Sequence, residues 1–206
     1  MAKFSSTTFG QISGRHGTAV AAQYNGKSIL KVYTAPSNPR TVKQKTHRLK
    51  FAIVTQGINP LRSVINDGFS DSQGYNWSMS STMTNAVSGT YPNLLLDYSK
   101  VVIAGGPLPR CEVAHVVKKS VTTVSADWDS TLFDGAAATD KVTFVFFNVA
   151  SRNRYVAKDV AVRSAAKCDI ALPAVWTGAT VHCWMYFSSA LTVGNSSSLY
   201  LAKLTL

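Results

Sequence analysis

Acidic side chains are scarce in this sequence, and glutamate is nearly absent. Only ten of the 206 residues are acidic, and a single one of these, Glu112, is glutamate. Charged residues make up 15% of the chain, against roughly 25% in an ordinary globular domain. Glutamate favours helix surfaces, whereas Ser, Thr and Val suit strands and turns. This composition therefore favours a mainly β protein.

Long apolar runs are also lacking, and cysteine is rare. No apolar run reaches the roughly 18 residues of a membrane span, and residues 1–8 lack the apolar core of a secretory signal. We therefore expect a chain that is cytoplasmic as synthesised, or part of a virion. Three cysteines leave at least one unpaired, and without a signal we expect them to be reduced and mostly buried. They are Cys111, Cys168 and Cys183.

Metal-binding and nucleophile motifs are missing as well. Cys111 and His115 are four residues apart, and His182 adjoins Cys183, but no pair has the short spacing of a structural zinc site. On a strand, Cys111 and His115 would lie about 13 Å apart. No GxSxG motif and no phosphate-binding loop occurs. We predict no metal, no cofactor and no catalytic residue.

One pair of acids merits separate mention. Asp127 and Asp129 flank Trp128, and on a strand both carboxylates would share a face, as a glycosidase site needs. A strand that runs into a turn, with Trp128 in the core, is the simpler interpretation.

The positive charge is concentrated at the start of the chain. The first 66 residues hold ten Lys and Arg and no acid, so they carry +10 of the net +11. Such a segment suits nucleic acid or an acidic protein partner, although few aromatic residues accompany it for base stacking. The candidate contact residues lie on a helix predicted from about residue 40 to 56: Arg40, Lys43, Lys45, Arg48 and Lys50.

Local signals organise the first 93 residues into a hairpin and helices. Two β-like runs, Thr18–Tyr24 and Lys27–Tyr33, flank Asn25-Gly26, the preferred pair for a type I′ turn. Asn38-Pro39 and Asn59-Pro60 each resemble a helix start, with a capping residue followed by proline. A third helix is predicted over Tyr75–Val87, and its residues expected to face inward are Trp77, Met79, Met83, Ala86 and Val87.

From residue 94 onward, short β-like runs alternate with turns. The run Lys141–Asn148 is apolar on both faces, as in a central strand. Seven or so strands within about 110 residues predict an antiparallel, immunoglobulin-like β-sandwich. We predict two domains, 1–93 and 94–206, although one continuous domain is also compatible. The predicted strands are Leu94–Ile103, Glu112–Val117, Ser120–Ala126, Lys141–Asn148, Val156–Arg163, Cys168–Leu172, Thr180–Phe187 and Ser198–Leu204.

Several motifs resemble a known family. They are the glycine-punctuated segment 9–17, Asn38-Pro39-Arg40-Thr41 with Gln44, Arg48 and Phe51, the segment 97–101, Trp128, and the segments 172–182 and 198–201. In this order they resemble a family of Bacteroidota proteins, about 200 residues long, that is catalogued only as a domain of unknown function. The pattern from Asn38 to Arg48 is also similar to stretches of phage and prophage structural proteins. The resemblance implies an immunoglobulin-like sandwich and a virion or assembly component, and it implies no catalytic residues.

Three functions remain open at this stage. The favoured one is a non-enzymatic structural or interaction subunit of a larger assembly, whose protein neighbours are either other proteins or further copies of itself. The second is a nucleic-acid-binding protein that uses the basic residues of segment 1–66. The third is a carbohydrate- or surface-binding module that uses exposed aromatic residues such as Trp77, Tyr75 or Trp176.

Overall fold

The computed structural model describes residues 2–3, 13–35, 37–69, 73–189 and 194–206. The chain divides into two compact units, Met1–Thr41 and Val42–Leu206. The sequence had favoured a division after residue 93. The three helices instead pack with the C-terminal sandwich, because their apolar side chains complete its second face.

The first unit is a four-stranded antiparallel sheet in the order β1-β4-β3-β2. Asn25 and Gly26, with φ values of 49° and 71°, form the turn between its two longest strands. This confirms the predicted hairpin. Among residues 13–35 and 37–41, Ala21 is the only buried one. The strands are β1 (Ala2–Lys3), β2 (Gly14–His16), β3 (Ala19–Tyr24) and β4 (Lys27–Val32).

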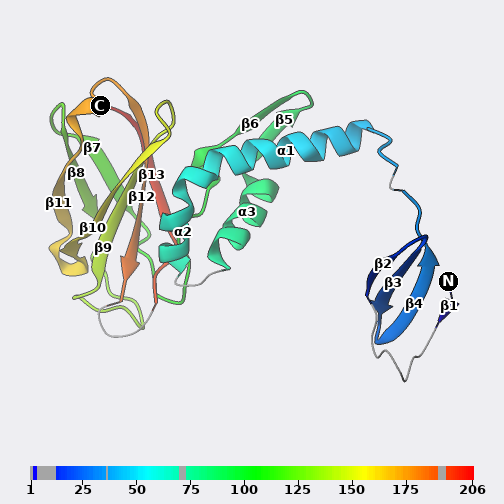
Figure 1. Ribbon diagram of the computed structural model, residues 1–206. Helices are drawn as coiled ribbons and strands as arrows, with labels where there is room; N and C mark the ends of the chain where they lie inside the picture. The colour runs from blue at the N-terminus through cyan, green and yellow to red at the C-terminus, as the bar shows by residue number, and fades with distance from the viewer. Residues whose placement is uncertain (1, 4–12, 36, 70–72, 190–193) are drawn as a thin grey trace. The chain divides into compact units, whose positions relative to one another are not determined.

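The second unit contains an antiparallel β-sandwich, as the sequence predicted (Figure 1). One sheet has the order β10-β9-β12-β13 and the other the order β11-β8-β7. Four strands facing three, with β9 beside β12 and β8 beside β11, give the immunoglobulin-like arrangement. The strands are β7 (Ala114–Lys118), β8 (Thr123–Trp128), β9 (Lys141–Asn148), β10 (Asn153–Val162), β11 (Lys167–Ala171), β12 (Thr180–Ser188) and β13 (Leu199–Thr205).

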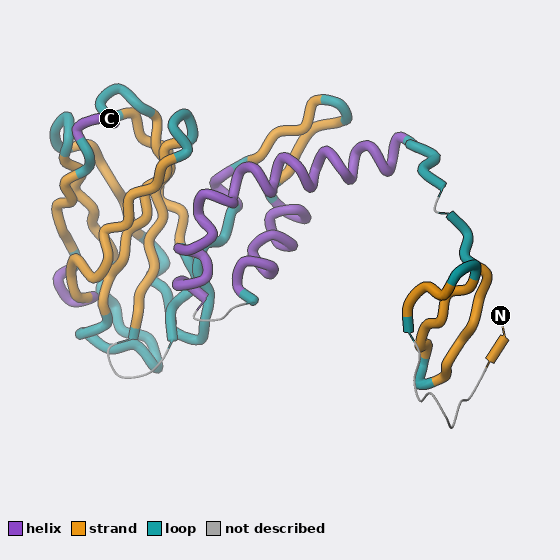
Figure 2. The backbone as a smooth tube through the Cα atoms, in the orientation of Figure 1, coloured by secondary structure: helices purple, strands orange, loops and turns teal. Residues whose placement is uncertain are grey.

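Strands β9 and β12 are buried on both faces. Alternate residues, such as Phe144 on β9 and Met185 on β12, enter the core between the two sheets. The intervening residues, such as Phe147 and Trp184, pack against the helices on the other face. The unit therefore has three layers, a sheet, a sheet and helices (Figure 2), and the apolar pattern predicted for the central strand is confirmed.

The helical layer follows the predicted order with shifted bounds. Its helices are α1 (Val42–Ile58), η1 (Asn59–Leu61), α2 (Arg62–Phe69) and α3 (Gly74–Asn85), and shorter turns of helix occur at η2 (Tyr98–Lys100), η3 (Arg163–Ala165) and η4 (Ala174–Trp176). The prediction of Arg40 on the first helix is wrong, because its φ of 50° is left-handed and the helix begins at Val42.

The inward face of α3 matches the prediction except at Trp77, since Ala86 is buried and Met79, Met83 and Val87 pack against the core of the helical layer. The buried residues of this helix are the small ones, Gly74, Ser78 and Thr82. Trp77 points outward and is 53% exposed. The small residues let the helix approach the neighbouring backbone closely, and Ser78 donates a 2.7 Å hydrogen bond to the carbonyl of Val102.

A predicted strand over residues 94–103 is replaced by two different structures. Its first part pairs as β6 (Asn93–Leu96) with β5 (Val87–Thr90), a strand that the sequence did not indicate. Val101 is extended, and residues 101–103 join no sheet. Side chains replace the ladder there, since Trp184 donates to the carbonyl of Val101 and the Ser198 hydroxyl accepts from the Ile103 N–H.

Hydrogen bonds attach the helical layer to the sandwich where α1 and α2 end. Arg152 and Arg154, at the start of β10, donate to the carbonyls of Gln56 and Pro60, where α1 ends. Cations are favourable at a helix C-terminus, where carbonyls lack intrahelical partners. At the end of α2, the Asn195 amide donates to the carbonyls of Asp67 and Gly68, each at 2.9 Å.

Candidate interaction surface

The N-terminal half of α1 carries the predicted basic residues. Residues 42–48 of this helix are exposed except for Thr46, whereas Val54 and Ile58 further along are fully buried. The first turn contains no acid. Cations at this end oppose the helix dipole, so this half gains stability neither from packing nor from its own charges.

The basic side chains do not share one face of the helix. At about 100° per residue, Lys45 and Arg48 lie near each other, while Lys43 and Lys50 fall near the opposite side. Lys50 is half-buried, whereas Lys43, Lys45 and Arg48 are exposed. The structure thus brings three of the five predicted contact residues to the exposed half of the helix, and Arg40 lies in the first unit.

Large apolar side chains are exposed among these cations. On α1, Val42 is 67% exposed and Phe51 is 50% exposed. The β5–β6 ribbon lies beside α1 (Figure 1), and its Leu96 contacts the helix at Gly57, near the end away from these cations. On the same strand, Leu95 is 71% exposed. We call α1 residues 42–51 the basic-apolar arm. Sequence periodicity missed its apolar part because Val42 and Phe51 look like core positions of an amphipathic helix.

The three aromatic residues proposed for surface binding differ in their exposure to solvent. Trp77 borders a mostly apolar hollow of about 400 Å³ and lies 5.2 Å from the Phe69 ring, centroid to centroid. Tyr75 is half-buried beneath the Arg62 guanidinium. Trp176 is only 3% exposed, so its proposed use as a surface contact is wrong.

The cysteines lie in apolar surroundings. Burial raises the pKa of Cys111 to about 11, and burial likewise raises the pKa of Cys168 to about 11. Both therefore remain protonated thiols at neutral pH and are poor nucleophiles. Cys183 faces the core of the sandwich, while its neighbour His182 faces the helical side. The described residues contain no group of three His, Cys, Asp or Glu that could hold a metal.

Asp129, one of the two acids beside Trp128, has a local structural role. Asp129 accepts hydrogen bonds from the backbone and the hydroxyl of Thr131, at 2.9 and 2.7 Å, and these bonds hold its pKa below the usual range. A glycosidase acid needs a raised pKa instead. Trp128 is buried, as predicted, and donates to the carbonyl of Arg163.

His182 is half-buried among aromatic rings. The Tyr98 ring lies 4.8 Å from it, and its Nδ1 lies 2.9 Å from the Tyr200 hydroxyl. Burial, with a smaller contribution from Lys203, lowers the pKa of His182, and Asp97 opposes this shift. The unfolded chain therefore binds a proton at this residue at a higher pH than the folded chain does.

This shift predicts weaker folding in mild acid. We expect the urea midpoint to fall as the pH is lowered from about 7.5 to about 5, since the unfolded state gains the proton first. Equilibrium unfolding followed by circular dichroism measures the change. The fall should be smaller in His182→Gln than in the unaltered chain, and an equal fall in both would contradict the assignment to His182.

The sequence matches a known family. A family model described as "Family of unknown function (DUF6266)" matches residues 11–202, which is nearly the whole chain. No curated protein matches the sequence. Within the described residues, no helix is both long enough and apolar enough to cross a membrane.

Proposed function

Since the chain belongs to DUF6266, a family of unknown function, we propose its role from its surfaces: it is a non-enzymatic subunit of a larger protein assembly. The sandwich and helices form the body of the subunit. The basic-apolar arm is the part that contacts a neighbour.

The exposure of the arm is the observation that carries this proposal. Val42 and Phe51 remain in contact with water on the same helix as three exposed cations. A helix half with neither packing nor favourable end charges is marginal alone in water. A neighbour with acidic groups around an apolar centre would stabilise this half of the helix, because it would bury the apolar side chains and pair with the cations.

The chain carries acidic groups of its own that suit this role. Glu112, Asp127 and Asp129 are exposed and lie at one end of the three-stranded sheet, where the Asp129 N–H donates to the carbonyl of Val113. We propose that the arm of one copy binds this acidic end of the next copy. Such a contact joins different surfaces of two copies and generates a ring or a filament.

The setting that we propose is a virion or another phage-derived particle. Its support is the resemblance of Asn38-Pro39-Arg40-Thr41, with Gln44 and Arg48, to stretches of phage structural proteins. The Bacteroidota origin of the family belongs to the same resemblance.

Charge reversal on the arm tests the assembly. After nuclease treatment, light scattering on a size-exclusion column should give one particle larger than a monomer, and high salt should leave it intact because the apolar contacts remain. K43E/K45E/R48E should raise the concentration at which the particle dissociates by about ten-fold or more, since like charges across an interface repel.

Two further variants make this test specific. K118E/K158E/K203E makes the same change in charge on exposed lysines of the sandwich and should assemble normally. Adding E112K/D127K to the arm variant should restore the particle. The arm is then acidic and the surface that it binds is basic, so opposite charges again face each other. A monomer at every concentration would overturn self-assembly, and equal loss in the control triple would overturn the role of the arm.

A further inference from the structure

One face of the N-terminal sheet gathers cations and tyrosine. In the register of this sheet, Val20 lies opposite both Arg15 and Lys31, and Tyr24 lies opposite Lys27. Residues directly opposite each other share a face, and successive residues of a strand alternate between faces. We call this face the tyrosine face, and its members are Arg15, Val20, Ala22, Tyr24, Lys27, Ile29 and Lys31.

The tyrosine face has a charged group at each end and an apolar floor between them. Tyr24 is 67% exposed beside Lys27 at one end. At the other end, the Arg15 guanidinium lies 3.9 Å from the centre of the Tyr33 ring, and its Nε donates to the carbonyl of Gly17. A hollow of about 210 Å³ between the ends is lined by Ala22, Gln23, Tyr24, Ile29 and Lys31.

No carboxylate neutralises these cations within the unit. Residues 1–66 contain no Asp or Glu, so Arg15, Lys27 and Lys31 have no acidic partner in this part of the sequence. Lys27 and Lys31 are four residues apart on β4, which corresponds to about 13 Å. The face therefore presents separated positive charges on either side of a flat apolar surface.

We propose that the tyrosine face binds single-stranded nucleic acid. Lys27, Lys31 and Arg15 contact phosphates, and an unpaired base stacks on the exposed ring of Tyr24. Single-stranded binding sites combine cations that follow the backbone with aromatic rings that accept any base. An acidic peptide would use the cations and leave the flat face of Tyr24 unused. This site goes beyond the proposed assembly and uses a different surface.

Titration of the full-length chain with a labelled thymidine 12-mer tests the cations. Fluorescence anisotropy should detect binding that weakens with salt. K27A/K31A should reduce the slope of log affinity against log salt by about 1.4, since each phosphate contact of a single strand contributes about 0.7. K118A/K158A removes two exposed lysines from the sandwich, and its slope should be unchanged.

Two substitutions at Tyr24 test stacking separately from charge. Tyr24→Leu should weaken binding about five-fold or more, and Tyr24→Phe should retain it, because only the latter keeps an aromatic ring. Thermal melting should show that both variants fold, since the side chain is exposed. Binding of Tyr24→Leu equal to that of the unaltered chain would overturn the proposal.

Competition experiments in the same titration test whether another ligand occupies this face. Equal competition by a hexaglutamate peptide or by the same sequence as a duplex would overturn the proposal, because neither offers an unpaired base. An equal loss of slope in K118A/K158A would also overturn it. K43E/K45E/R48E should still retain the stacking effect of Tyr24, so failure of the assembly can be distinguished from failure of this site.

Discussion

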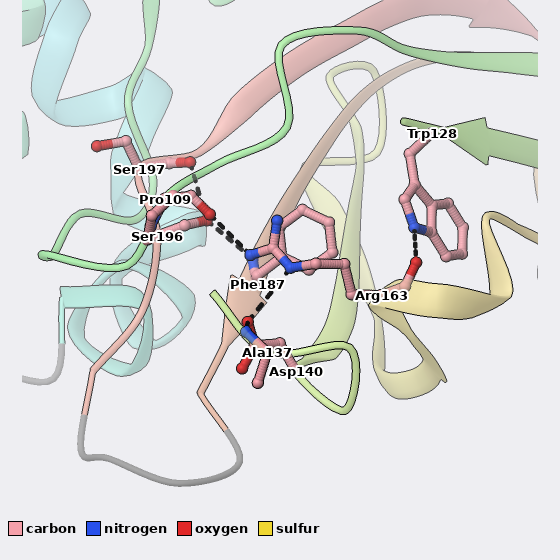
Figure 3. A network of polar contacts seen from close by, with 8 residues as sticks. All are labelled: Pro109, Trp128, Ala137, Asp140, Arg163, Phe187, Ser196 and Ser197. Carbon is pink, nitrogen blue, oxygen red and sulfur yellow. Dashed lines mark hydrogen bonds and ion pairs between the residues drawn. The ribbon is translucent and has the colours of Figure 1, made fainter. Parts of the chain in front are cut away.

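Replacing Arg163 by methionine should destabilise the second unit by about 3–5 kcal/mol, since it leaves a buried carboxylate without its partner. Arg163 and Asp140 are both fully buried, and the Arg163 Nε lies 3.2 Å from Asp140 Oδ2 (Figure 3). The guanidinium also donates to the carbonyl of Pro109 and lies 3.7 Å from the centre of the Phe187 ring. Urea unfolding at neutral pH measures the loss.

A double variant distinguishes the contribution of the ion pair to stability from the contribution of side-chain packing. Asp140→Leu combined with Arg163→Met should be less destabilised than either single variant, because no unpaired charge remains. Lys119→Met removes one partner of the exposed pair with Asp169 and should have little effect. A double variant as unstable as the sum of the singles would show that packing, rather than the charge pair, accounts for the loss.

Trp184→Ala should destabilise the second unit by about 3–5 kcal/mol, the usual cost of truncating a fully buried large aromatic residue. Trp184 has no exposed surface, and it packs between the four-stranded sheet and the helices. Its Nε1 also donates to the carbonyl of Val101 at 3.0 Å. Because the helices and the sheet share this residue, we expect both layers to unfold in a single transition at a lower urea concentration.

An exposed tryptophan serves as the matched control for this prediction. Trp77→Ala makes the same change at a residue that is 53% exposed, and it should cost about 1 kcal/mol or less. Circular dichroism follows the sheet and helices together, while hydrogen exchange at α1 and β9 follows them separately. Loss of protection in α1 alone would contradict a shared core.

Local signals predicted most of the elements of this protein. A type I′ hairpin turn needs positive φ at two neighbouring residues, and Asn-Gly is the pair that adopts this conformation most readily, as Asn25 and Gly26 do here. Asn59-Pro60 begins the short helix η1 that leads into α2, since a helix tolerates proline only in its first turn. Ile58, not Asn59 as predicted, is the N-cap, and no side chain caps this helix. The apolar run at Lys141–Asn148 became a strand with precisely the predicted bounds. In each case, the information lies within a few neighbouring residues.

Other outcomes depended on residues far apart in the sequence. Residues 101–103 have a strand-like composition, but Ser78, Trp184 and Ser198 satisfy their backbone groups instead of a neighbouring strand. The candidate basic residues were found from charge alone. Which of these residues are exposed and which are packed depends on where the four-stranded sheet and the β5–β6 ribbon cover α1.

The sequence by itself therefore determined the mainly β character, the hairpin, the central strand and the acid-free first third. Propensity, turn chemistry and charge are properties of short segments, so they need no knowledge of the fold. Only the tertiary structure decided that helices cover the second face of β9 and β12, that Trp77 faces outward, and that Arg163 is buried against Asp140. Burial is a property of what packs on a residue, and here that partner is distant in sequence.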